Sequence, residues 1–201
     1  MRLAVARPIV LALIPEGSLW RIVAVALGTA LLSVAARIEI PLPFSPVPVT
    51  GQTFAVLVIG ASLGARLGAL SVAVYVLEGL LGLPVFAGGA SGTARLVGPT
   101  GGYLVGFVVA AAIVGWLAER GWTRTIPSTV AAMLFGEAAI YLFGLAWLSR
   151  FPLAVGVLDA GLVPFVARDL YRLALAVVVL APITRRVDQF GSRSGSQAVR
   201  R

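Results

Sequence analysis

The sequence predicts an all-α membrane protein with six transmembrane helices, and its composition is the main reason. Hydrophobic residues make up 59% of the 201-residue chain. Charged residues make up only 12%, whereas soluble domains average about 25%. At roughly 20 residues for each membrane span, about six spans fit into a chain of this length.

Six apolar segments can be marked in order. They cover residues 19–36, 49–63, 65–83, 101–117, 129–148 and 165–183. The second segment is shorter than a ~30 Å hydrocarbon core when helical, so we expect it to start inside the membrane or to be sheltered by protein. Gly64, Arg66 and Gly68 predict a turn between the second and third segments. Residues 149–164 are expected to add a short interfacial helix.

Arginine placement predicts the orientation. Eleven of the sixteen basic residues, all of them arginine, lie before or at the start of the first span, after the sixth, or at the second and fourth connections. An even number of spans puts these on one side, and basic connections stay in the cytoplasm. We therefore expect a multi-pass protein of the cell (inner or plasma) membrane, with both termini cytoplasmic. Its parts are a lead at residues 1–18, a membrane domain at 19–187, and a tail at 188–201 that is predicted to be disordered.

Missing residue types exclude several kinds of chemistry. The chain has no cysteine, histidine or lysine, which removes disulfides, thiol nucleophiles, histidine bases and the commonest zinc ligands. Nucleic-acid binding is not expected, because the arginines lie mainly at the ends of apolar runs. We expect no cofactor or metal, and no enzymatic activity.

Two outward connections carry the strongest functional signals. Residues 37–51 include four prolines within eight positions, which predicts a stiff extended lid without helix or strand pairing. A rigid linker is the alternative. Residues 82–100 are rich in glycine, which lets backbone approach a ligand closely and exposes amide groups at the start of the fourth helix. The alternative for this segment is a flexible connector.

Four charged residues fall within apolar segments. Placing an ionisable group inside the membrane costs free energy, so such residues suggest function. Asp169 and Arg172 share a helix face and could pair, either at a site or as a structural ion pair. Glu137 and Tyr141 also lie on one face of the fifth segment. Glu78 could simply reach interfacial water.

Four motifs together resemble the BioY family, the biotin-binding S components of energy-coupling-factor transporters. They read GLPVFAGG at 82–89, GPTGGYL at 98–104, IPLPFSPVPVTGQT at 40–53 and PFVARDLYR at 164–172. The resemblance covers about residues 20–185. In the last motif, Arg168 stands where the family usually has glycine and Arg172 where it usually has lysine.

The resemblance implies the S-component fold, with a biotin pocket near the outer surface under the loops 37–51 and 82–100. It also implies a partner module of one transmembrane coupling protein and two ATPase subunits. The chain itself contains no Walker motif, which agrees with ATP hydrolysis by another subunit.

The expected binding residues combine cations, amide-type partners and apolar walls, as biotin requires. They are Gln52, Phe86, Arg95, Thr100, Gly101, Gly102, Tyr103, Glu137, Tyr141, Asp169 and Arg172. Arg95 and Arg172 are candidates for the carboxylate, and Gln52 for the cyclic urea. Asp169 could accept from the urea or hold Arg172. The aromatic residues could wall the ring.

Small residues on the first helix suggest a docking face for the coupling protein. Ala26 and Ala30 are four apart, as are Ala24 and Gly28, and such pairs let helices approach closely in lipid. Packing within the chain is the alternative for this spacing. Three alternatives remain for the whole protein: an S component for another vitamin, a membrane-embedded enzyme, and a channel or structural protein.

Overall fold

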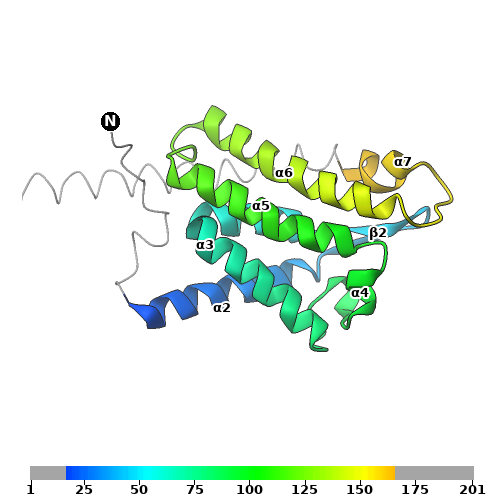
Figure 1. Ribbon diagram of the computed structural model, residues 1–201, viewed down its shortest axis with the longest axis horizontal. Helices are drawn as coiled ribbons and strands as arrows, with labels where there is room; N and C mark the ends of the chain where they lie inside the picture. Colours follow the sequence, from blue (N-terminus) through cyan, green and yellow to red (C-terminus); the bar gives the residue numbers. More distant parts are fainter. Residues whose placement is uncertain (1–16, 166–201) are drawn as a thin grey trace, which may run out of the picture.

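Four long helices dominate the computed structural model, which describes residues 17–165 (Figure 1). They are α2 (Ser18–Ala35), α3 (Gln52–Leu80), α5 (Gly101–Glu119) and α6 (Ile126–Leu148). The shorter elements are β1 (Glu39–Leu42), β2 (Ser45–Thr50), the 3-10 turn η1 (Ala87–Gly89), α4 (Ala94–Val97) and α7 (Val157–Gly161). By length and composition alone, each of the four is a candidate membrane span, although a turn at Gly64 divides α3. Nearly all of the predicted lead, the sixth apolar segment beyond its first residue, and the tail lie outside the described residues.

The predicted turn between the second and third apolar segments lies inside α3. Gly64 adopts φ 80° and ψ 178°, a conformation that is open to glycine and costly for other residues, and it divides α3 into two helices. The two halves pack against each other closely, because a Cβ atom on Gly68 would lie 3.0 Å from the Gly60 Cα atom. The two segments are therefore separate helices, as predicted, although the break falls at Gly64 alone.

α5 supports this turn. The Ala65 N–H at the start of the second half of α3 donates a hydrogen bond to Glu119 Oε1 at 2.9 Å. A carboxylate at a helix start satisfies a free N–H group and interacts favourably with the helix dipole. Gly115 lies directly against the Gly64 backbone, where any larger side chain would collide. Small residues thus permit the close helix packing that stabilises membrane bundles.

The proline-rich segment 37–51 differs from our prediction. It forms an antiparallel hairpin of β1 and β2, so the expectation that its prolines exclude strand pairing was wrong. The paired residues are Glu39 with Thr50, Ile40 with Val49, and Leu42 with Ser45. Proline is tolerated at a free strand edge or at an irregularity, and both strands of a two-stranded sheet have a free edge. Pro41 coincides with the irregularity between Ile40 and Leu42.

Short elements gather at one end of the bundle. The hairpin, α4 and α7 all lie at the right-hand end of Figure 1, whereas the α5–α6 connection lies at the other. α7 lies within the stretch 149–164 where a short helix was expected. Elements from three separate parts of the sequence therefore meet at this end.

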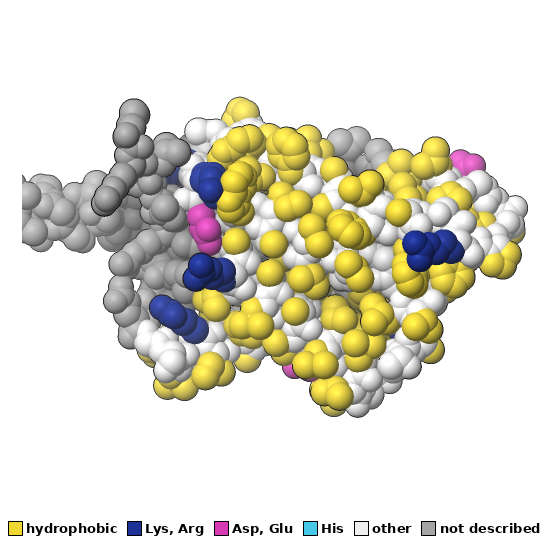
Figure 2. All heavy atoms as spheres, in the orientation of Figure 1, with side chains coloured by type: hydrophobic (Ala, Val, Ile, Leu, Met, Phe, Trp, Pro, Cys, Tyr) yellow, Lys and Arg dark blue, Asp and Glu magenta, His cyan; other side chains and the backbone are white. Residues whose placement is uncertain are grey.

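The outer surface of the helices is apolar. Figure 2 shows hydrophobic side chains over the middle of the molecule and basic side chains towards its two ends. Leu27 is 66% exposed on α2 and Leu142 is 68% exposed on α6. Such exposure suits contact with lipid, in which apolar side chains need no further covering.

Candidate binding pocket

A pocket opens at the end of the bundle where the hairpin, the loop before α5 and the three long helices α3, α5 and α6 meet. The space between its walls is about 620 Å³, open mouth included. Its lining residues are Val47, Pro48, Thr50, Gln52, Thr53, Phe86, Ala87, Arg95, Thr100, Tyr103, Leu104, Phe107, Ile140, Tyr141 and Phe165. The lining is mostly apolar with a few polar groups, as in sites for small organic ligands.

Six of the predicted binding residues line this pocket. They are Gln52, Phe86, Arg95, Thr100, Tyr103 and Tyr141. They come from the start of α3, the glycine-rich loop, α5 and α6, so the fold brings together residues that are up to about ninety positions apart in the sequence. Asp169 and Arg172, which were predicted to join them, lie outside the described residues.

Three other predicted residues are not in the lining. Glu137 is buried in α6. Gly101 and Gly102 form the start of α5, where a side chain on Gly101 would meet the Leu96 carbonyl oxygen and one on Gly102 would meet Trp147. These glycines therefore permit close packing of the loop and of α6.

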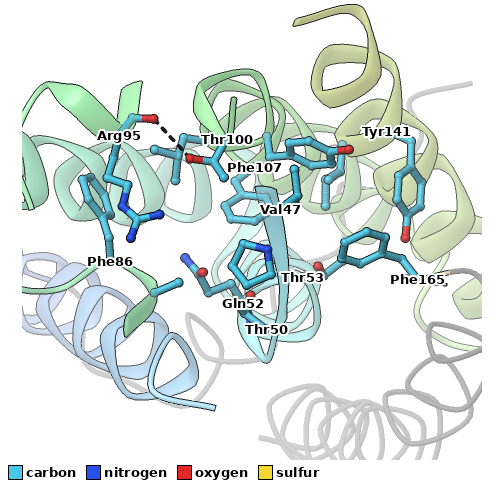
Figure 3. A pocket seen from close by; sticks show the side chains of 15 residues that line it. Val47, Thr50, Gln52, Thr53, Phe86, Arg95, Thr100, Phe107, Tyr141 and Phe165 are labelled. Atoms are coloured by element: carbon cyan, nitrogen blue, oxygen red, sulfur yellow. Dashed lines mark hydrogen bonds between the residues drawn. The ribbon is translucent and has the colours of Figure 1, made fainter. Parts of the chain in front are cut away.

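Arg95 and the Tyr141–Phe165 pair lie on opposite sides of the pocket. Figure 3 shows Arg95, Gln52 and Phe86 on one side, and Tyr141 with Phe165 on the other. The ring centroids of Tyr141 and Phe165 are 6.4 Å apart. Thr100 Oγ1 donates to the Arg95 carbonyl oxygen at 3.2 Å, which ties the backbone of Arg95 to the residue before α5.

Arg95 is the cationic side chain of the lining. Its side chain is half-buried. Within residues 17–165, its guanidinium forms no hydrogen bond or ion pair with another residue. A guanidinium presents five donors and is always charged, so a half-buried one without a partner in the described part of the chain favours an anionic ligand.

Hydrogen bonds hold α7 against the pocket, a feature that the motifs did not indicate. The Tyr103 hydroxyl donates to the Gly161 carbonyl oxygen at 2.9 Å. Ser45 Oγ, at the start of β2, donates to the Ala160 carbonyl oxygen at 2.7 Å. α7 therefore fixes both the wall at Tyr103 and the tip of the hairpin.

The two predicted lid segments touch each other. Arg37 Nη2 donates to the Pro84 carbonyl oxygen at 2.5 Å, which joins the segment 37–51 to the segment 82–100 on the exposed side. Sequence reasoning did not select Arg37. An arginine in an outward connection gives no local signal of its partner, because that partner is a backbone carbonyl 47 positions away.

The four predicted docking positions lie on two different faces of α2. Ala24 and Gly28 are buried, and a Cβ atom on Gly28 would lie 2.8 Å from Ser71 Oγ. Ala26 and Ala30 are exposed on the other side. The first pair packs within the chain, and only the second pair is free to meet a partner helix.

Comparison with known proteins gives a consistent result. The family model described as the BioY family matches residues 11–189. A "Probable biotin transporter BioY" from Pyrococcus horikoshii is 42% identical over 155 residues, which cover 77% of this chain and 90% of the relative. The "Biotin transporter BioY" of Thermotoga maritima is 42% identical over 152 residues, which cover 75% of this chain and 88% of the relative.

A solved structure agrees with these relatives. It is the crystal structure at 2.1 Å of the S-component for biotin from an ECF-type ABC transporter. It matches with a TM-score of 0.74 and 27% identity, covering 85% of this chain and 95% of the other. The predicted S-component fold is thereby confirmed. Because the family match spans most of the chain and the fold agrees with it, this multi-pass membrane protein belongs to the BioY family.

Proposed function

We propose that this chain is the biotin-binding S component of an energy-coupling-factor transporter. The observation that carries the proposal is the Arg95 guanidinium, which lines the pocket without a partner among residues 17–165. Biotin has one carboxylate, which suits a guanidinium of this kind. The names of the relatives and of the matching structure point to the same ligand.

The rest of the pocket suits the rest of biotin. Biotin combines an aliphatic chain, a thioether ring and a cyclic urea, so its site needs apolar walls and a few amide-type partners. Phe86, Tyr103 and Tyr141 supply aromatic walls, and Gln52 supplies an amide for the urea. We retain Asp169 as a urea acceptor or as a partner of Arg172, and Arg172 as a second group for the carboxylate.

Thr100, Gly101, Gly102 and Glu137 complete the proposed site in supporting roles. Thr100 bonds to the Arg95 backbone, and the two glycines allow the loop to approach α6. The lids of the pocket are the hairpin segment 37–51 and the loop 82–100, which Arg37 joins.

Delivery of biotin requires partners. We propose that the chain works with a transmembrane coupling protein and ATPase subunits, and that it is not itself an enzyme. The exposed pair Ala26 and Ala30 on α2 supplies the docking face in this proposal. The arginine distribution supports a location in the cell membrane with both termini cytoplasmic. In this proposal the cytoplasmic parts at the two ends are a lead at 1–18 and a tail at 188–201.

The direct test is calorimetry with purified full-length protein. Titration with biotin should give saturable heat with one site per chain and should raise the thermal midpoint of unfolding. Thiamin and riboflavin serve as matched vitamins without the same arrangement of carboxylate and urea. No response to biotin together with a clear response to one of these vitamins would overturn the proposal.

A further inference from the structure

Tyr75 is a buried polar side chain next to the pocket but not in its lining. It lies in the second half of α3 and is fully buried. Its hydroxyl oxygen is 2.8 Å from Gln52 Nε2 and 3.0 Å from the Val85 carbonyl oxygen. This one hydroxyl therefore connects a pocket residue at the start of α3 with the glycine-rich loop.

The chemistry of these three groups fixes the direction of both hydrogen bonds. The Val85 carbonyl can only accept, so the Tyr75 hydroxyl must donate its single proton to it. The Tyr75 oxygen is then left to accept, and Gln52 must present its amide N–H group to it. If the Gln52 amide turned over, two acceptors would compete for one proton, and one buried acceptor would lose its bond.

The fixed orientation leaves the oxygen of the Gln52 amide available. Gln52 is 4% exposed and lines the pocket. Among residues 17–165, no group donates a hydrogen bond to its Oε1 atom. Buried acceptors nearly always have a partner, so an acceptor left open at a pocket wall is a place for a donor on a ligand.

Tyr75 also supports the neighbouring wall. Its ring meets the Phe86 ring edge-on, with centroids 5.6 Å apart and an interplanar angle of 77°. Gly79, one turn further along α3, lies directly under the Phe86 ring, where a Cβ atom would collide with it. Both packing and the hydroxyl hydrogen bonds hold Tyr75 in place, so its oxygen is a fixed hydrogen-bond acceptor for Gln52.

We infer that Tyr75 is a specificity-determining positioning residue, which holds Gln52 with its carbonyl oxygen towards the ligand. The pocket then selects a ligand with an N–H donor at this point over one with an acceptor. The inference rests on the proposed function, under which that donor is a urea N–H of biotin. Tyr75 itself acts only through Gln52.

The test compares biotin with its cyclic carbamate analogues, in which either urea N–H is replaced by a ring oxygen. This change converts a donor into an acceptor with almost no change in shape. Calorimetry on the purified full-length protein gives both dissociation constants. For the wild type, at least one carbamate should bind about tenfold more weakly than biotin, or weaker still, since the lost hydrogen bond leaves the Gln52 oxygen unpaired.

The quantity to follow is the ratio of the carbamate dissociation constant to the biotin dissociation constant. Tyr75→Phe should reduce this ratio to about threefold or less, because Gln52 is then free to turn its N–H group towards the carbamate oxygen. Gln52→Leu should do the same by removing the amide, and it tests the inference independently if Tyr75→Phe does not fold. Tyr103→Phe is the matched control: it deletes a tyrosine hydroxyl that bonds to Gly161, so it should change both affinities by the same factor.

Each outcome has one meaning. A wild-type protein that does not bind biotin contradicts the proposed function and leaves no ratio to explain. A wild type that binds biotin, with a ratio that survives in both folded Tyr75→Phe and folded Gln52→Leu, overturns the inference. A ratio that falls equally in Tyr103→Phe also overturns it, because the effect would then belong to the pocket in general.

Discussion

At the scale of single residues, the charge of Arg95 favours a ligand that carries a carboxylate. A charge-assisted hydrogen bond is worth about 1.5–3 kcal/mol, or roughly ten- to a hundredfold in affinity. Biotin amide, which lacks the carboxylate charge, should therefore bind the wild type more weakly than biotin by about that factor. Competition against radiolabelled biotin would measure both affinities.

The variant Arg95→Gln sharpens this prediction. It should weaken binding of biotin and bring the two ligands to similar affinity. Arg150→Gln is the matched control, because Arg150 is exposed and packs over Trp147 instead of lining the pocket. If Arg95→Gln still prefers biotin over the amide by the wild-type factor, the carboxylate is bound elsewhere.

At the scale of elements, the two faces of α2 predict different effects of added bulk. Ala26→Trp or Ala30→Trp should leave biotin affinity intact but lower co-purification with the coupling protein and uptake in cells, because bulk holds the partner helix away. Ala138→Trp, at an exposed position on α6, is the control and should not lower uptake. Loss of biotin affinity with an intact complex would show that this face packs inside the protein.

The turn within α3 depends on Gly64. Its φ of 80° with ψ of 178° is costly for any residue with a side chain, so Gly64→Ala should destabilise the protein by about 1–3 kcal/mol. Gly17→Ala is the control, since a Cβ atom there meets nothing closer than 3.8 Å and the cost should stay within about 0.5 kcal/mol. Thermal unfolding in detergent compares the two, and equal midpoints would mean that the turn tolerates a side chain.

At the scale of the whole molecule, the proposed orientation puts the two ends of the bundle in different compartments. The chain has no cysteine, so single cysteines are clean probes. Thr93→Cys, in the exposed glycine-rich loop, should react with a membrane-impermeant maleimide in intact cells. Arg124→Cys, in the exposed α5–α6 connection, should react only after the membrane is permeabilised. The reverse pattern would overturn the orientation.

The sequence predicted much of the candidate site because its signals are local. Motifs in the two lid loops and aromatic residues in the later helices selected six residues that line the pocket. Tyr75 and Arg37 were missed for the opposite reason, since each acts on a group far along the chain. Neither a tyrosine in an apolar helix nor an arginine in a loop reveals such a partner.

Hydropathy and motifs alone determined the membrane class, the helical segments, the turn near Gly64 and the family. These properties follow from composition and from the order of residues, which lipid and glycine conformation constrain directly. Only the tertiary structure decided that the proline-rich segment forms a hairpin, that α7 packs against Tyr103, and that Ala24 and Gly28 face inward. Those outcomes depend on which distant backbone lies opposite each residue, and spacing along one segment carries no information about that.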